Sequence, residues 1–227
     1  MPDDDLGMTA PGALAAAYGG ITAVVSPLSG DDLLRPTRCR GWVVADLLFH
    51  VLCDAQRALV TFASPAPGPS DVDHVSYWQS FPSDPPDQNA WWVRRSAAAF
   101  PTPGTIVTMW NETAPAAVRA ASLADLDSFV TTQGHVLSVG DFVATLVTEA
   151  VIHHLDLTLD LPAAPSPDPA AVTVAVSTMD GLMTDDVVRP TAWSDADYLL
   201  KASGRLPLEP RDRVELGEAA GWFPLLS

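Results

Sequence analysis

The chain has 227 residues, of which 48% are apolar and 18% charged, a balance that suits a compact protein with a sizeable core and excludes a disordered chain. Its formal net charge is −16, from 28 acidic against 12 basic residues, so phosphate backbones and anionic lipids would repel it and nucleic acid is excluded as a partner. Residues 1–5 lack the positive charge of a secretory signal, no apolar run approaches the roughly 18 residues of a membrane span, and two cysteines cannot form a disulfide framework, so a cytoplasmic protein is expected.

The first half of the chain predicts two long helices separated from the rest by an irregular segment. Residues 10–29 are Ala-rich and predict a first helix, interrupted at the glycine pair 19–20. Residues 42–63 predict a second helix, and the six prolines of segment 64–88 predict a long connection of the kind that overhangs a site. A short helix is expected over residues 89–100.

The next predicted helices complete a bundle. Residues 105–122 predict a helix that Pro115 should kink. Ser138 and Asp141 form a capping pair just before an apolar run that reaches Leu161, which predicts the fourth long helix.

The remainder, after a Pro/Ala linker over residues 161–169, predicts three shorter helices, at 170–184, about 194–203 and 210–219. No alternating strand pattern of useful length and no internal repeat is visible. We therefore expect an all-α protein, in which residues 1–160 form an up-down four-helix bundle and residues 161–227 form a short helical extension packed on it.

Three residues of the predicted helices could form a metal site. Glu149 and His153 are four residues apart in the fourth predicted helix, which puts them about 40° apart in projection and roughly 6 Å apart along the axis. A carboxylate and an imidazole at this spacing hold a divalent ion weakly, so a third ligand must come from another helix. His50, the histidine of the second helix, is the best candidate and makes a three-ligand site.

Each of these residues also has a plainer interpretation. His50 shares its helix face with Asp46, Asp54 and Arg57, so it is either a solvated histidine or part of a polar pocket. In the pocket interpretation, Asp46 or Asp54 accepts the other ring N–H of the bound imidazole. Glu149 lies among apolar residues, where a carboxylate needs a partner to offset desolvation.

Other polar and aromatic residues are weaker candidates. His154 projects about 140° from Glu149 and is expected to pack or cap, whereas Asp156 is either a partner of a ligand or a surface residue. His74 and His135 lie in predicted loops and are expected to be solvated. Cys39 has a cationic setting that favours thiolate, but a packing role is preferred. Four tryptophans are candidates for either pocket wall or core, namely Trp42, Trp91, Trp92 and Trp110.

Two stretches resemble a known family. Residues 35–51 fit the pattern Pro-Thr-x-Cys-x-Gly-Trp-x-Val-x-Asp-Leu-x-x-His, and residues 141–157 contain a Glu-x-x-x-His pair in an apolar helix. Both resemble the mycothiol-dependent maleylpyruvate isomerase-like proteins of the damage-inducible-B-like (DinB/YfiT-like) superfamily of metal-binding four-helix bundles. The resemblance covers roughly residues 10–160 and implies that His50, Glu149 and His153 bind zinc or another divalent ion. Arg38 and Arg40 stand where proline is frequent in the family, and Val43 replaces a capping Thr or Ser, which predicts a weaker start to the second helix.

The resemblance also implies a reaction. Three protein ligands leave open positions at which a low-molecular-weight thiol, mycothiol foremost, would become a thiolate and attack a small electrophile as an isomerase or S-transferase. The ion would be Zn²⁺, with Ni²⁺, Mn²⁺ or Fe²⁺ as alternatives, and the protein a monomer or homodimer. The rival interpretations are a non-catalytic, stress-associated metal-binding bundle and a non-haem iron enzyme that uses the same two histidines and one carboxylate.

Overall fold

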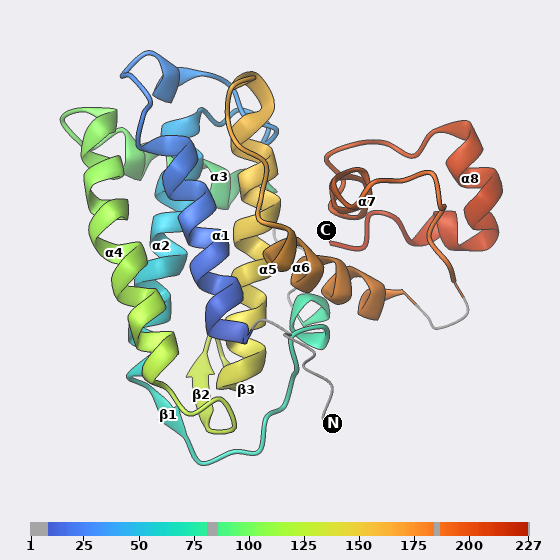
Figure 1. Cartoon of the computed structure of the whole chain (residues 1–227), viewed down its shortest axis with the longest axis horizontal. Helices are drawn as coiled ribbons and strands as arrows, with labels where there is room; N and C mark the ends of the chain where they lie inside the picture. Colours follow the sequence, from blue (N-terminus) through green and yellow to red (C-terminus); the bar gives the residue numbers. More distant parts are fainter. Residues whose placement is uncertain (1–8, 81–85, 184–186, 227) are drawn as a thin grey trace, which may run out of the picture.

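The computed structural model describes residues 9–80, 86–183 and 187–226, most of them in helices (Figure 1). The acidic start of the chain, residues 81–85 near the end of the Pro-rich segment and the last residue of the predicted helix 170–184 lie outside the described residues. The α-helices are α1 Ala10–Val25, α2 Val44–Phe62, α3 Pro86–Ala97, α4 Pro103–Leu123, α5 Val139–Leu157, α6 Pro169–Leu182, α7 Asp195–Ala202 and α8 Pro210–Leu216.

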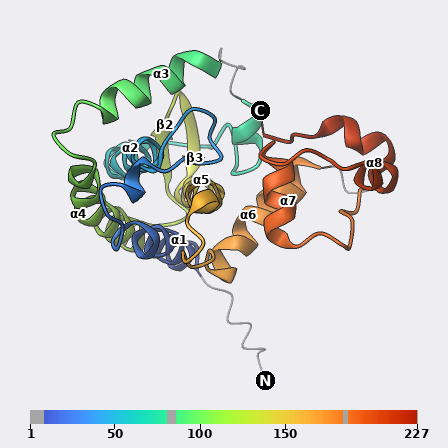
Figure 2. The same ribbon diagram turned by 90° about the horizontal axis from the view of Figure 1, so that it is seen from above.

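The four longest helices, α1, α2, α4 and α5, pack side by side around a shared core (Figures 1 and 2). Each presents an apolar stripe to the others, as expected for amphipathic helices that bury one face. The fully buried side chains include Leu14 and Ile21 of α1, Leu48 and Leu52 of α2, Ile106 and Trp110 of α4, and Val143 and Val147 of α5.

The helix directions differ from the alternation of an up-down bundle. The strand that follows α2, the strand that follows α4 and the strand that precedes α5 belong to one small sheet, so these three helix ends lie together. Helices α2 and α4 therefore run the same way, and α5 runs against both. The C-terminal end of α1, at Ala23 and Val24, and the segment 160–165 that follows α5 line one hollow of about 370 Å³, so the C-terminal ends of α1 and α5 lie together and these two helices are parallel. The order is up, down, down, up, because the connection through α3 carries the chain back along the bundle (Figure 1).

The small sheet was missed by the sequence analysis, which expected no strands. Strands β1 Pro65–Ala66, β2 Phe129–Thr132 and β3 His135–Ser138 pair antiparallel in the order β1-β2-β3. Gln133 and Gly134 make the turn between β2 and β3 with positive φ angles of 48° and 86°. With at most four residues each, the strands are too short to show a period of two in the sequence.

Helix α1 runs without interruption through the glycine pair that was predicted to break it. A Cβ atom on Gly20 would lie 3.1 Å from Nδ1 of His154, whereas one on Gly19 would meet nothing within 4 Å. Gly20 therefore allows α1 to approach α5 closely, and its role is packing. Helix α4 likewise continues through Pro115.

The caps of α2 and α5 fix where the two helices of the candidate site begin. Ser138 accepts a hydrogen bond from the Asp141 N–H at 3.0 Å, which confirms the predicted cap of α5. At α2 the side chain of Asp46 accepts from the Val43 N–H at 3.0 Å. Asp46 thus supplies the carboxylate half of a capping box, so α2 has a side-chain cap although Val43 replaces a capping hydroxyl residue.

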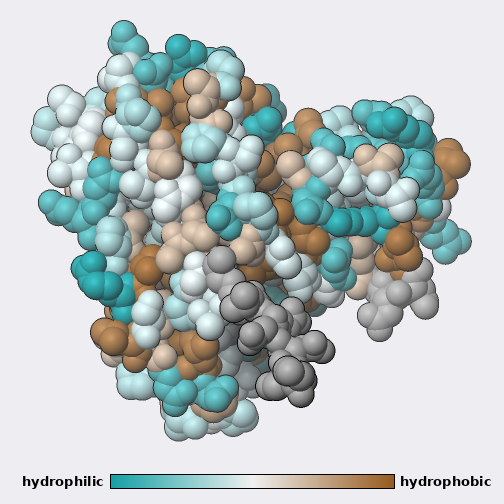
Figure 3. All heavy atoms as spheres, in the orientation of Figure 1, coloured by the Kyte–Doolittle hydropathy of each residue, from teal (hydrophilic) through white to brown (hydrophobic). Residues whose placement is uncertain are grey.

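The chain after residue 160 forms helices, and the described part of it contains no strand. Helix α6 packs against α5 and α1, and α7 packs against α6 and α5. Figure 1 shows α7 and α8 as a lobe beside the bundle, and Figure 3 shows apolar residues gathered where the lobe meets the bundle. The residues from Trp193 to Leu226 are called the C-terminal lobe below.

Among the described residues, one helical segment is long and apolar enough to cross a membrane, Val139–Asp160, although no such run was expected from the sequence. Its mean hydropathy is 1.3, and 72% of the apolar window is buried inside the protein. Burial of this kind is typical of the central helix of a soluble bundle, and α5 occupies that position here.

Candidate metal centre

Three predicted ligands converge between α2 and α5. His50 comes from α2, and Glu149 and His153 come from successive turns of α5. Oε1 of Glu149 lies 3.1 Å from Nε2 of His50 and 3.2 Å from Nε2 of His153. The two rings meet edge to face, with centroids 4.9 Å apart. One carboxylate oxygen therefore sits between two imidazole nitrogens from different helices.

The spacing of these atoms suits a single divalent ion. The three ligand atoms all lie within 4.8 Å of one another. Two ligands at metal–ligand distances of about 2.1 Å and a tetrahedral angle are about 3.4 Å apart, close to the separations seen here. The donor set of two nitrogens and one oxygen is also one that zinc and several transition metals accept.

The pKa shifts of Glu149 and His153 describe the charges of the site without an ion. Burial works to raise the pKa of the Glu149 carboxyl, but the neighbouring His153 and His50 rings hold that pKa well below its usual value. Burial works to lower the pKa of His153, but the Glu149 charge and hydrogen bonds to Asp156 and Cys39 raise it well above 6.5. Glu149 and His153 thus stabilise each other's charged forms, and a bound cation could replace the proton on His153.

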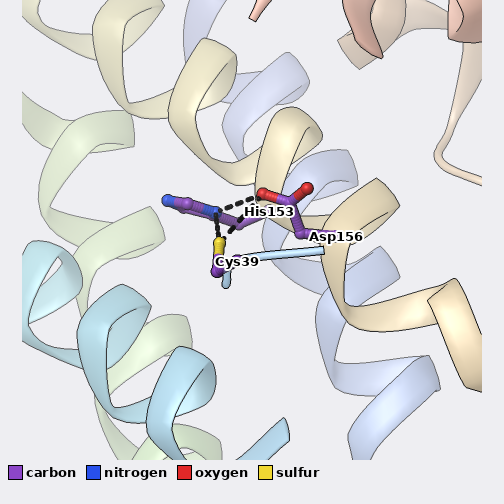
Figure 4. A group of neighbouring side chains, drawn as sticks. All are labelled: Cys39, His153 and Asp156. Atoms are coloured by element: carbon purple, nitrogen blue, oxygen red, sulfur yellow. Dashed lines mark hydrogen bonds and ion pairs between the residues drawn. The ribbon is translucent and has the colours of Figure 1, made fainter. Parts of the chain in front are cut away.

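The far nitrogen of His153 is anchored by Asp156. Nδ1 of His153 lies 3.0 Å from Oδ2 of Asp156, whose side chain is fully buried (Figure 4). A carboxylate accepts, so Nδ1 carries the proton, and in the neutral ring Nε2 is left free to ligate. Of the two interpretations offered by the sequence, Asp156 is the buried partner of the candidate ligand His153 and not a surface residue.

Cys39 reaches the same carboxylate from the loop before α2. Its Sγ lies 3.3 Å from Oδ2 of Asp156 and 3.9 Å from Nδ1 of His153 (Figure 4). The S–H donates to the carboxylate, and the backbone N–H of Arg38 donates to the Asp156 carbonyl at 3.2 Å. The loop carrying Cys39 is therefore fastened to the end of α5, behind His153.

Asp54 faces the ligand side of His50, contrary to the expectation that Asp46 or Asp54 would accept the other ring N–H. Oδ2 of Asp54 lies 3.6 Å from Nε2 of His50, the nitrogen that also meets Glu149. This oxygen is buried and has no hydrogen-bond partner among the residues that the structure describes. Burial, opposed by the His50 charge and reinforced by Glu149, raises the pKa of Asp54. An acceptor beside the centre that lacks a hydrogen bond is available to a donor from a bound molecule.

The other histidines lie away from the three ligands. His154 is buried and its Nε2 donates to the Pro165 carbonyl at 2.8 Å, which confirms its predicted packing role. His74 contacts Asp141 at 2.8 Å, and His135 contacts Asp71 at 3.3 Å. Both are partly buried and contact a carboxylate, and His135 lies in β3, so the expectation that both are solvated loop residues was wrong.

Of the four candidate tryptophans, Trp42 lies beside the candidate metal centre. Its ring is 5.4 Å from the ring of His50. Trp110 is a core residue whose indole N–H donates to Thr22 at 2.9 Å. Trp91 and Trp92 are about half exposed on α3, where Trp92 stacks at an angle on Phe49.

Sequence reasoning missed Arg205, which comes from the C-terminal lobe. Its Nε and Nη2 both lie 3.2 Å from Oδ2 of Asp156. No local spacing relates the two residues, which are 49 positions apart in different elements. The only signal in the sequence was an isolated arginine in a chain with few cations.

Fold and site together define a class: a mostly helical protein in which two histidines and a carboxylate from two packed helices form a candidate metal centre. A family model of the mycothiol maleylpyruvate isomerase N-terminal domain matches residues 14–158, and the chain belongs to this family. The match confirms the resemblance seen in the two sequence motifs and implies a mycothiol-related, DinB-like metal-binding function. It contains all three candidate ligands and Asp156, but not Arg205. No curated protein and no solved structure matches the chain significantly.

Proposed function

We propose that the protein is a divalent-metal-dependent enzyme that uses a low-molecular-weight thiol, mycothiol foremost, to isomerise or S-conjugate a small electrophile. The observation that carries the proposal is the convergence of His50, Glu149 and His153 on one point between α2 and α5. Three protein ligands leave coordination positions open, as at catalytic sites, whereas a structural zinc is normally closed by a fourth protein ligand.

The residues divide the work as follows. His50, Glu149 and His153 hold the ion, and Asp156 keeps the His153 ring turned so that Nε2 faces it. When bound, the ion supplies a Lewis acid that lowers the pKa of a thiol enough to form thiolate near neutral pH. Oδ2 of Asp54, buried and without a hydrogen bond, is placed to accept the proton that the thiol loses.

The chemistry at the electrophile then needs no protein nucleophile. The thiolate adds to an activated alkene, and the adduct either expels the thiolate after bond rotation or keeps it and takes up a proton. The first outcome is isomerisation and the second is S-transfer. Trp42, packed against the His50 ring, supplies an apolar wall for the substrate.

The finer assignments belong to the same proposal. Zinc is the ion we favour, with nickel, manganese or iron as alternatives. The fold is a DinB/YfiT-like four-helix bundle over residues 1–160, with residues 161–227 as a helical extension. We further propose a cytoplasmic monomer or homodimer whose partners are small molecules and not nucleic acid or membranes, in keeping with the net charge of −16.

Thiol binding tests the proposal most directly. Protein purified without a metal-affinity step is analysed for its elements, loaded with zinc, and titrated with mycothiol in a calorimeter. The loaded wild type should bind mycothiol, and Glu149→Ala should bind neither ion nor thiol while keeping its helical circular dichroism. If the loaded wild type binds no mycothiol, glutathione or cysteine at millimolar concentration, the thiol proposal fails. A non-catalytic metal-binding bundle or an iron-dependent oxygen enzyme would then take its place.

A further inference from the structure

Arg205 is aimed at the back of the metal centre by the turn that ends α7. Gly204 has a φ of 73°, and the Arg205 N–H donates to the Leu200 carbonyl at 2.7 Å, a typical glycine-terminated helix end. Nη1 of Arg205 donates to the Ser203 carbonyl at 2.7 Å. Both the backbone and the guanidinium of Arg205 are therefore held by its own turn before any contact with the bundle is counted.

The guanidinium contacts the bundle at the carboxylate of Asp156. Nε of Arg205 lies 3.4 Å from Oδ1 and 3.2 Å from Oδ2 of Asp156, and Nη2 lies 3.2 Å from Oδ2. The Asp156 side chain has no exposed surface, whereas that of Arg205 is 26% exposed. A buried carboxylate needs donors that satisfy its oxygens, and the Arg205 guanidinium contacts both of them, beside the His153 ring on Oδ2.

Asp156 in turn has one neighbour that matters for the ion. Its Oδ2 accepts from Nδ1 of His153, and Nε2 of the same ring lies 3.2 Å from Glu149. Hydrogen bonds to the far nitrogen of a ligating imidazole fix its orientation and tautomer. The contacts thus form a continuous series from the C-terminal lobe, through a buried carboxylate, to a ligand.

We propose that Arg205 is a positioning residue for the metal centre, by which the C-terminal lobe holds Asp156 and, through it, orients His153 for ion binding. This inference rests on the proposed function only in that the centre binds an ion. It adds that the centre is incomplete within residues 14–158, the part of the chain that matches the family, because the guanidinium that holds its buried carboxylate, alongside Cys39 and His153, comes from the lobe.

Ion affinity measured against a competing chelator tests this role, with Zn²⁺ and Co²⁺ as probes. Loss of a partner of a ligating histidine typically weakens metal binding by roughly 10- to 100-fold, and Arg205→Met should fall in this range. Arg205→Lys keeps the charge and should recover part of the affinity. Arg213→Met is the matched control, because Arg213 is an exposed arginine of the same lobe, and its affinity should equal that of the wild type.

A double-mutant cycle shows whether Arg205 acts through Asp156. In an Asp156→Asn background, Arg205→Met should cause no further loss of affinity, because the acceptor it positions has already been changed. The absorption spectrum of bound Co²⁺ should differ between wild type and Arg205→Met, since the ligand field follows the His153 orientation. If Arg205→Met does not fold by circular dichroism, Arg205→Lys and Asp156→Asn carry the same comparison.

Three results would overturn the inference. The first is an Arg205→Met variant with the ion affinity and cobalt spectrum of the wild type. Even if its unfolding temperature were lower, this result would mean that Arg205 only attaches the lobe to the bundle. Additive losses in the double-mutant cycle would show that Arg205 does not act through Asp156. A wild type that binds neither ion would remove the proposed function itself, and this inference with it.

Discussion

Two buried polar clusters of the described residues, one in the bundle and one in the C-terminal lobe, differ in how far their hydrogen-bonding groups are satisfied. In the lobe, Asp212 accepts from Lys201 Nζ, from the Trp193 indole N–H and from the Glu209 N–H, and Lys201 lies over the Trp193 ring. In the bundle, Glu149 shares one oxygen between two histidines, and Oδ2 of Asp54 has no hydrogen-bond partner among the described residues.

This difference indicates different roles for the two clusters. A buried network whose members all have hydrogen-bond partners fixes one arrangement and is stable without a ligand. A buried cluster that contains an acceptor without a hydrogen bond, and several candidate ligand atoms close together, needs a bound proton, ion or substrate to be stable. The lobe cluster should therefore matter for folding alone, and the bundle cluster for binding.

The largest expected effect is the loss of metal in His153→Ala. This change removes a ligand, so its ion affinity should fall by more than the roughly 10- to 100-fold expected for losing only the partner of a ligand. Metal content after dialysis against a dilute chelator measures it.

His154→Ala is the matched control for that experiment. His154 is the next residue along α5, and its Nε2 is already bonded to the Pro165 carbonyl. Its metal content should equal that of the wild type, although lost packing against α1 lowers stability. Equal loss of metal in the two variants would mean that the wrong histidine has been assigned as ligand.

Asp212→Ala should have the largest effect on stability. It leaves Lys201 buried, with 6% of its side chain exposed, and without its counter-ion. Breaking a buried ion pair from one side typically costs about 3–5 kcal/mol. Urea unfolding should show a loss of this size, while zinc affinity of the folded variant stays within twofold of wild type. A large drop in affinity without unfolding would contradict the division between the two clusters.

The pH dependence of stability should reverse when the ion is added. In the metal-free protein the pKa of His153 is raised well above 6.5, so its contribution is complete below about pH 6.5 and is lost as pH rises through the raised pKa. The free energy of unfolding, measured in urea with a chelator present, should fall over that range. With zinc present it should rise instead, because protons compete with the ion. His153→Gln should remove both trends, and their persistence in that variant would contradict the assignment.

Asp54→Asn should have the smallest effect on folding and a clear one on turnover. The substitution removes a buried charge that lacks a hydrogen bond, so the protein should gain roughly 0.5–1 kcal/mol of stability. Zinc affinity should change little, but thiol-dependent turnover should fall because the proton acceptor is gone. A variant with full activity would show that Asp54 takes no part in the reaction.

What could be predicted from the sequence was what depends on local spacing. The helix periodicity located α2 and α5, and the four-residue interval placed Glu149 and His153 on one face, where the structure has them. The strands were not predictable because each has four residues or fewer, and Gly20 was read as a helix break because its reason, the ring of His154, lies in another helix. Arg205 on Asp156 depends on how the lobe packs on α5, which no local pattern encodes.

The distance along the chain between the ligands has a consequence for the unfolded state. His50 and Glu149 meet at 3.1 Å although 99 positions separate them. An ion held by both is a reversible cross-link that closes a long loop, and such clips remove the most chain entropy from the unfolded ensemble. Under the proposed function the ion binds only the folded chain, so its free concentration would add to stability by mass action. The contact between α2 and α5 would then depend on the supply of metal as well as on packing.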